Sequence, residues 1–234
     1  EIDIVVVPRS AQLFRNHPSL HRVVEYDKRG KDSGISGFLR MAKSLKRTSY
    51  QLAVIPHRSI RSSFLAKLAG IPTRVGFDRS SGRMFLTNIV RYRNELHEID
   101  RNISLLEGLG QKHESRELPV MYPSRDDSKH VEKLLSAHGF ARSQKLIALA
   151  PGTIWNTKRW MIERFADLGK QLVANGFRVV LIGGSEDKSL CDKLVASVGS
   201  SNIFNTAGEL SLLQSAELLS HCRVLVSNDS APMH

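Results

Sequence analysis

The residues best placed for chemistry lie in a loop of small, polar and basic side chains, PGTIWNTKRW at positions 151–160. The loop follows an apolar run and precedes a segment with helical spacing, and its glycine lets the backbone approach a ligand closely. A hydroxyl and an ammonium group, here on Thr153 and Lys158, can hold a phosphate. The spacing is not that of a Walker A loop. Taken alone, the loop is better explained as a strand-to-helix connection with a solvated Lys158–Arg159 pair.

Two more polar loops follow apolar runs in the same half of the chain. Residues 183–187, GGSED, can place the Asp187 carboxylate beside a ribose diol, although glycines followed by acids are also ordinary helix capping. Residues 227–234, SNDSAPMH, have the composition of a helix start, where free N–H groups bind anions. Ligands bind at the carboxyl ends of parallel strands, so the three loops together predict a polar cleft for a nucleotide diphosphate.

Other motifs that carry chemistry are missing from the sequence. It contains no G-x-G-x-x-G, G-x-S-x-G or H-E-x-x-H pattern, and its nine histidines show no metal-ligand spacing. No bound metal and no cofactor are therefore expected. Cys191 and Cys222 are too few for a disulfide framework or a zinc site, and they indicate two reduced thiols.

Apolar periodicity predicts two series of strands alternating with helices, which is typical of α/β proteins with parallel sheets. Strands are expected at 2–7, 22–26, 51–55, 73–76, 146–150, 177–182 and 223–226. Helices are expected at 38–45, 59–69, 96–109, 126–138, 162–174, 186–198 and 211–219. The pattern divides the chain into a first domain at 1–122, a linker and connecting helix at 123–144, and a second domain at 145–234.

The charge is strongly basic, with 34 Lys and Arg against 23 Asp and Glu, formally +11. Such a balance favours a phosphorylated small molecule, an anionic membrane surface or nucleic acid, or it describes a well-solvated surface. The aromatic fraction of 6% and the dispersed basic residues argue against nucleic acid. No apolar run has the length of a spanning helix, and residues 1–20 lack a signal-peptide core, so a cytoplasmic location is expected.

The three loops, in this order, resemble glycosyltransferase family 9, the ADP-heptose:lipopolysaccharide heptosyltransferases. The matching strings are PGTIWNTKRW (151–160), VVLIGGSEDKSLC (179–191) and NTAGELSLLQSAELLSHCRVLVSNDSAPMH (205–234). Looser matches are RSSFLAKLAGIPTRVGFDRSSGR (61–83) and HEIDRNISLLEGLG (97–110). The pattern is most similar to the heptosyltransferase II branch, and it indicates a piece that lacks both ends of the family's chain.

The resemblance implies a GT-B fold, in which two Rossmann-like domains enclose a cleft. The second domain holds the donor ADP-heptose, and the first holds the acceptor, the lipid A–Kdo core of lipopolysaccharide. Transfer of heptose inverts the anomeric centre without a metal. The enzyme would work on the cytoplasmic face of the inner membrane, in peripheral contact with anionic lipid.

The resemblance also implies individual roles for residues of the second domain. Catalytic roles fall on Lys158, which neutralises the leaving ADP, and on Asp229, which binds heptose hydroxyls. The donor-binding residues are Thr153, Lys158, Asp187, Leu210, Asp229, Ser230, Ala231 and His234. Thr153 would contact the diphosphate, Asp187 the ribose and Leu210 the adenine, while Ser230 and Ala231 would meet the diphosphate at a helix start.

Two departures from the family pattern stand out. Ala231 occupies a position where many members have glycine, which does little harm if its φ is negative. The family's catalytic base, an aspartate in a Gly-Asp turn after the first strand, has no counterpart here, because Asp3 lies inside a strand. This piece alone is therefore expected to be inactive or weakly active.

The basic surplus is consistent with the phosphate-rich acceptor. Arg58, Arg61 and Arg79 lie in loops of the first domain where the acceptor would bind, as do Arg9 and Arg83. Three alternatives stay open: another GT-B nucleotide-sugar enzyme, such as a UDP-sugar transferase or epimerase; a catalytically inactive, truncated member of the family; and a non-catalytic protein that binds phosphate or nucleic acid.

Overall fold

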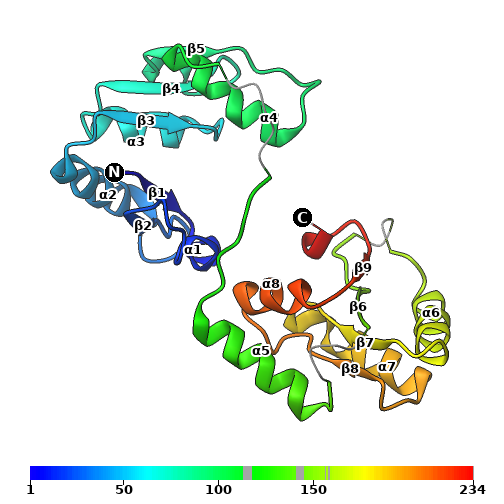
Figure 1. Cartoon of the computed structure of the whole chain (residues 1–234). Coiled ribbons are helices and arrows are strands. Elements are labelled where there is room, and N and C mark those ends of the chain that lie inside the picture. Colours follow the sequence, from blue (N-terminus) through cyan, green and yellow to red (C-terminus); the bar gives the residue numbers. More distant parts are fainter. Residues whose placement is uncertain (113–117, 141–144, 156, 158, 234) are drawn as a thin grey trace. The chain divides into compact units, whose positions relative to one another are not determined.

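The computed structural model describes residues 1–112, 118–140, 145–155, 157 and 159–233. The chain divides into two compact units (Figure 1). Unit 1 comprises Glu1–Ala11 and Leu20–Val120, and unit 2 comprises Gln12–Ser19 and Met121–His234. The domain limits expected from the sequence, 1–122, 123–144 and 145–234, stay a prediction.

Residues 12–19 group with unit 2 because their side chains contact the segment that follows residue 120. The side-chain amide of Asn16 donates to the carbonyl oxygen of Tyr122 at 3.0 Å. The His17 ring packs edge-on against the Tyr122 ring, with centroids 4.9 Å apart. These contacts join segments more than 100 residues apart in sequence, and local periodicity carries no signal for them.

Unit 1 contains two short parallel sheets, ordered β1-β2 and β3-β4-β5. Its strands are β1 (Asp3–Val6), β2 (Arg22–Glu25), β3 (Leu52–Ile55), β4 (Thr73–Phe77) and β5 (Asn88–Val90). Its helical elements are α1 (Pro8–Phe14, which runs on into unit 2), α2 (Gly34–Thr48), α3 (Ile60–Leu68), η1 (Arg83–Phe85), α4 (Glu98–Ile103) and η2 (Ser104–Leu109). One core joins the sheets, since Tyr26 after β2 and Ile55 of β3 pack with the buried sides of α2 and α3.

The segment expected as one helix at 96–109 is divided between α4 and the 3₁₀ turns of η2. Leu105, which is 1% exposed, packs there with Val75, Phe77 and Val90 of β4 and β5. A β-carbon on Gly108 would lie only 2.6 Å from a methyl group of Val75. Glycine therefore lets this tight segment lie directly on the sheet.

A nearly buried carboxylate ties together the amino ends of β1, β2 and β3. Asp3 accepts hydrogen bonds from Arg22 at 3.1 Å, from His21 at 3.0 Å and from the Tyr50 hydroxyl. Burial alone would raise the pKa of Asp3, but the hydrogen bonds from Tyr50 and His21 and the charge of Arg22 outweigh it, and the pKa lies below its ordinary value. The same guanidinium reaches Thr48 at the end of α2 at 3.0 Å.

Unit 2 is a four-stranded parallel sheet in the order β8-β7-β6-β9. Its strands are β6 (Leu146–Ala150), β7 (Arg178–Leu181), β8 (Ile203–Asn205) and β9 (Val224–Ser227). Its helices are α5 (Arg125–Ala137), α6 (Ile162–Ala174), α7 (Lys188–Val198) and α8 (Leu212–Ser220), and its short turns are η4 (Ser185–Asp187) and η5 (Ala231–Met233). Serine at the N-caps of α5 and α8 forms a capping box with the third helical residue, which satisfies otherwise orphaned N–H groups.

Helices cover both faces of this sheet (Figure 1). Successive residues of β6 face opposite layers of these helices, as the strand period requires. Leu146, Ala148 and Ala150 face the core beneath α5 and α8. Ile147 and Leu149 face the core beneath α6 and α7. The fully apolar sequence of β6 is thus explained by burial on both faces.

Candidate functional site

The loops after β6 and β9 leave the sheet of unit 2 at neighbouring points. Ala150, the last residue of β6, pairs with Ser227, the last residue of β9. From β6 the sheet runs to β7 and β8 on one side, and the chain then returns to place β9 on the other side. This reversal is a topological switch point, where open parallel sheets bind ligands.

A buried amide, Asn228, links these two loops. It follows β9 directly, is 5% exposed, and donates from Nδ2 to the carbonyl oxygen of Pro151 at 2.7 Å. Its Oδ1 accepts the backbone N–H of Trp160 at 2.9 Å. The sequence pattern predicts no role for Asn228. Its position could have indicated one, because it is an amide that directly follows a predicted strand and lies within the third loop.

The second predicted loop meets the first through Asp187. This half-buried carboxylate accepts the N–H of Gly184 at 3.0 Å, which is the capping arrangement that the sequence allowed. It also lies against Gly183 and Gly152, where a β-carbon on either glycine would collide with it. All three predicted loops therefore converge at the carboxyl edge of one sheet.

The other predicted donor-site residues lie at or near this edge. Thr153 is half-buried, and its hydroxyl accepts the N–H of Trp155 at 3.4 Å. The hydroxyl of Ser230 donates to the Asn228 carbonyl oxygen at 3.3 Å, and Asp229 is exposed beside it. Leu210 is half-buried and packs against the core of α5 and α8. Lys158 and His234 lie outside the described residues.

Ala231 begins the short turn η5. Among the described residues other than glycine, only Ser49 has a positive φ, so the φ of Ala231 is negative, as the substitution of alanine for glycine requires. Alanine therefore fits this turn without backbone strain.

In unit 1, Arg58 and Arg79 both contact Tyr92. The guanidinium carbons lie 4.7 Å and 5.8 Å from the centroid of its ring, and that of Arg101 lies 4.6 Å away. Arg101 also pairs with Glu98. Arg58 and Arg79 are exposed, and no ion pair is recorded for them within the described part of the chain. The ring thus brings two predicted acceptor-site cations together.

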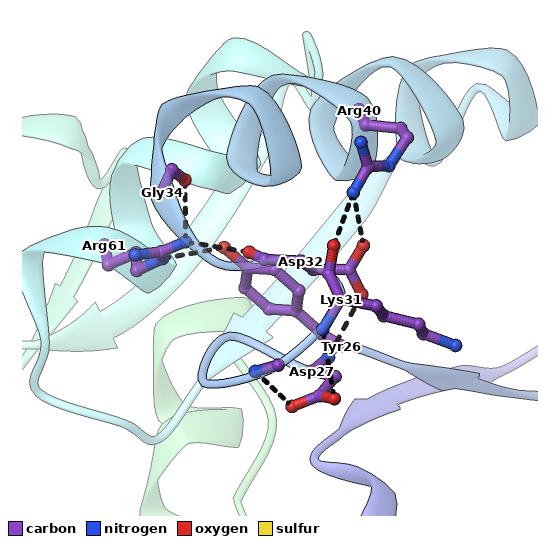
Figure 2. A network of polar contacts seen from close by, with 8 residues as sticks. Tyr26, Asp27, Lys31, Asp32, Gly34, Arg40 and Arg61 are labelled. Carbon is purple, nitrogen blue, oxygen red and sulfur yellow. Dashed lines mark hydrogen bonds and ion pairs between the residues drawn. The ribbon is translucent and has the colours of Figure 1, made fainter.

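Arg61, the third predicted acceptor-site residue, lies in an internal network (Figure 2). Its Nε donates to the Tyr26 hydroxyl at 2.7 Å, and it reaches the carbonyl oxygens of Asp32 and Gly34 at 3.5 Å. The neighbouring Asp32 carboxylate accepts from Arg40 at 3.2 Å. Arg61 therefore connects the start of α3 with the loop that leads into α2.

Nothing in the described ranges suggests a metal or a reactive thiol. No group of three His, Cys, Asp or Glu side chains there has the geometry to hold a metal ion. Burial raises the pKa of both thiols to about 12, with nearby carboxylates of Asp187 and Asp192 adding to the effect at Cys191. Within those ranges, no helix is long and apolar enough to cross a bilayer.

The sheet of unit 2, with helices on both faces and polar loops at its switch point, is that of a ligand-binding α/β protein. The chain belongs to glycosyltransferase family 9 (heptosyltransferase), whose pattern it matches over residues 38–234. The resemblance described above is thereby confirmed.

Individual relatives support the same family. Lipopolysaccharide heptosyltransferase 2 of Salmonella typhimurium is 31% identical over 206 residues, which cover 83% of this chain and 59% of the relative. Lipooligosaccharide heptosyltransferase 2 of Haemophilus ducreyi is 25% identical over 248 residues, which cover 100% of this chain and 70% of the relative. The chain thus spans about three-fifths of the length of the Salmonella protein.

Solved structures show the same fold. A family 9 glycosyltransferase from Veillonella parvula matches with a TM-score of 0.90 at 25% identity, over 100% of this chain and 68% of that one. ADP-heptose lps heptosyltransferase II of E. coli matches with a TM-score of 0.81 at 23% identity, over 100% and 71%. The α/β fold with parallel sheets predicted from the sequence is therefore confirmed.

Proposed function

We propose that the protein transfers L-glycero-D-manno-heptose from ADP-heptose to the inner core of lipopolysaccharide, with inversion at the anomeric carbon and without a metal. The observation that carries this proposal is the convergence of three polar loops at the switch point of unit 2, in a member of a heptosyltransferase family. The GT-B arrangement of two Rossmann-like domains around a cleft is part of the proposal.

The donor lies, on this proposal, at the carboxyl edge of the sheet of unit 2. Thr153 and Lys158 contact the diphosphate, Asp187 the ribose and Leu210 the adenine. Asp229 holds the heptose hydroxyls. As the bond to the sugar breaks, Lys158 offsets the charge that grows on ADP, and a fixed cation in a site sheltered from water stabilises such charge strongly. The family motif is completed by the hydroxyl of Ser230, the backbone N–H of Ala231, and His234.

The acceptor lies, on this proposal, against the exposed cations of unit 1. Arg58 and Arg79 both contact the Tyr92 ring, and guanidinium groups suit the phosphate or carboxylate groups of the lipid A–Kdo core. Since that acceptor is part of a lipid, the protein works at the cytoplasmic face of the inner membrane, where its formal charge of +11 favours anionic lipid.

Inversion needs a general base on the acceptor hydroxyl. The family resemblance gives that role to an aspartate in a Gly-Asp turn after a strand that comes before β1. Among the described strands, β1 and β3 each pair along one edge, so each offers a second edge to which another parallel strand can add. We propose that such a strand and its turn supply the base.

Calorimetric titration with ADP, UDP and GDP tests the donor site. ADP is expected to bind tightest, and Lys158→Ala to weaken it about tenfold through loss of a charge-assisted contact. Lys170→Ala removes the same charge from the exposed side of α6 and serves as the matched control. Preference for UDP would favour another nucleotide-sugar enzyme. Equal affinity for all three nucleotides, or no binding by a folded sample, would contradict the assignment.

A further inference from the structure

We propose that Asn228 is a positioning residue: its side-chain amide holds Pro151 and Trp160, the two ends of the loop after β6, in the positions that binding of the donor diphosphate requires. The inference rests on the proposed donor site. It assigns to Asn228 no contact with the donor itself.

The geometry is that of a closed ring. The loop leaves β6 at Pro151 and returns at Trp160, nine residues later in the sequence, and both ends meet one amide. The backbone N–H of Asn228 also bonds to the carbonyl oxygen of Ala150 at 3.3 Å, which fixes the amide against the end of β6. The Trp160 ring packs edge-on against Phe165 of α6, with centroids 4.9 Å apart.

The chemistry of the two partners selects asparagine. A carbonyl oxygen at Pro151 needs a donor, and an N–H at Trp160 needs an acceptor, so only a side chain that carries both can serve them at once. The amide of Asn228 is buried, and loss of either bond would leave a polar group without a partner at the edge of the core. The partners also determine which way the amide points.

Two of the described residues between the bonded ends have little packing to hold them. Ile154 is 85% exposed and Trp155 is 65% exposed. Thr153 and Arg159 contact each other within the loop, through a guanidinium that donates to the Thr153 carbonyl oxygen at 2.9 Å. Side chains as exposed as these add little restraint of their own, and the hydrogen bonds at Pro151 and Trp160 are both made by Asn228.

Asn228→Asp keeps the shape and the acceptor, replaces the donor by a second oxygen and adds a negative charge, so Asn228→Ala, which adds no charge, is measured beside it. Hydrogen exchange should show faster exchange at the Trp160 amide and its loop neighbours, with β7 unchanged. ADP affinity should fall about tenfold, the cost of one buried hydrogen bond. Asn175→Asp makes the same chemical change at the exposed end of α6, where the amide bonds only to the Gln171 carbonyl oxygen, and should alter neither measurement.

Lowering the pH tests whether the lost hydrogen-bond donor causes the change, and recovery of ADP affinity together with loop protection is the readout that a purely structural role would not move. When the new carboxyl is protonated it carries an O–H that can donate to the Pro151 carbonyl oxygen, as the amide does. Burial disfavours the charged form of such a carboxyl, and acidification restores the protonated form. Loop protection in Asn228→Asp should therefore recover as the pH falls, and it should not change in the wild type or in Asn175→Asp.

Three results would overturn the inference, and two of them come from hydrogen exchange. One is loop exchange in Asn228→Asp that matches the wild type at every pH, and the other is a slower or unchanged loop in Asn228→Ala, which lacks both hydrogen-bonding groups. If the donor-site assignment is wrong, ADP will bind neither the wild type nor any variant. Hydrogen exchange will still test whether the hydrogen bonds of Asn228 hold Pro151 and Trp160. If the loop opens but ADP affinity stays unchanged, the positioning role is refuted.

Discussion

The carboxylate of Asp187 occupies the space that a β-carbon on Gly152 would need. The two residues come from different loops of unit 2, one after β6 and the other after β7. Glycine is thus required at position 152 because of what another loop places there. Its backbone φ does not require it, since Gly152 is absent from the glycines with positive φ.

Gly152→Ala should therefore push the Asp187 carboxylate out of position. Overpacking of this kind costs roughly 1–3 kcal/mol of stability, and nucleotide binding should weaken with it. The measurement is thermal unfolding with and without ADP. Asp187→Ala in the same chain should remove most of the stability loss caused by Gly152→Ala, as coupled neighbours do in a double-mutant cycle. Additive losses would show that the two side chains do not compete for space.

The arginines of unit 1 should separate into two kinds. Arg61→Ala should lower the free energy of unfolding by about 1–3 kcal/mol, because it removes a charge-assisted hydrogen bond to Tyr26 and contacts to the α2 loop. Arg58→Ala and Arg79→Ala should change stability by less than about 0.5–1 kcal/mol, as exposed cation–π contacts do. Denaturant unfolding of the three variants checks this order, and equal losses would contradict it.

Arg58 and Arg79, which are expected to contribute little to stability, should contribute to acceptor affinity. Charge reversal at Arg58 together with Arg79 is expected to weaken binding of the phosphorylated core while leaving ADP affinity unchanged. Lys43→Glu together with Arg47→Glu, both on the exposed side of α2, makes the same change in net charge and is the control. Unchanged acceptor affinity in an active enzyme with both reversals would refute the acceptor assignment.

Acid stability should report on Asp3. Its native pKa is lowered, so the stability it contributes is present above the pKa of the unfolded chain, about 3.9, and is lost as the pH falls through the lower native value. Asp3→Asn should therefore destabilise the protein at pH 7, and the difference from the wild type should shrink below about pH 4. Melting temperatures measured from pH 7 to pH 3 test the sign, and a difference that grows in acid would contradict it.

The thiols should be unreactive in the folded protein. A pKa of about 12 leaves Cys191 and Cys222 protonated at pH 8, and Cys191 is also fully shielded from solvent. A thiol reagent should label neither residue until denaturant is added. Rapid labelling of Cys191 in the native state would show that α7 opens locally far more often than its packing implies.

Much of unit 2 could be read from local patterns. Ile147 and Leu149 alternate with small apolar residues in a run that is buried on both faces, and β6 forms where the sequence predicts it. The three-residue strands β5 and β8 were missed because so short a run gives no period to recognise. The helix α1 was missed as well, since it has only seven residues, Pro8 included.

The sequence by itself determined the family, the parallel α/β architecture and the three loops, because each of these depends on residues close together in the chain. Only the tertiary structure decided that Asn228 closes the loop after β6, that Asp187 excludes a side chain at position 152, and that Tyr92 brings Arg58 and Arg79 together. Each of these relationships joins residues 13 to 77 positions apart. Strand order and packing decide which residues distant in sequence come into contact, and the local hydrophobic period of the sequence carries no information about these contacts.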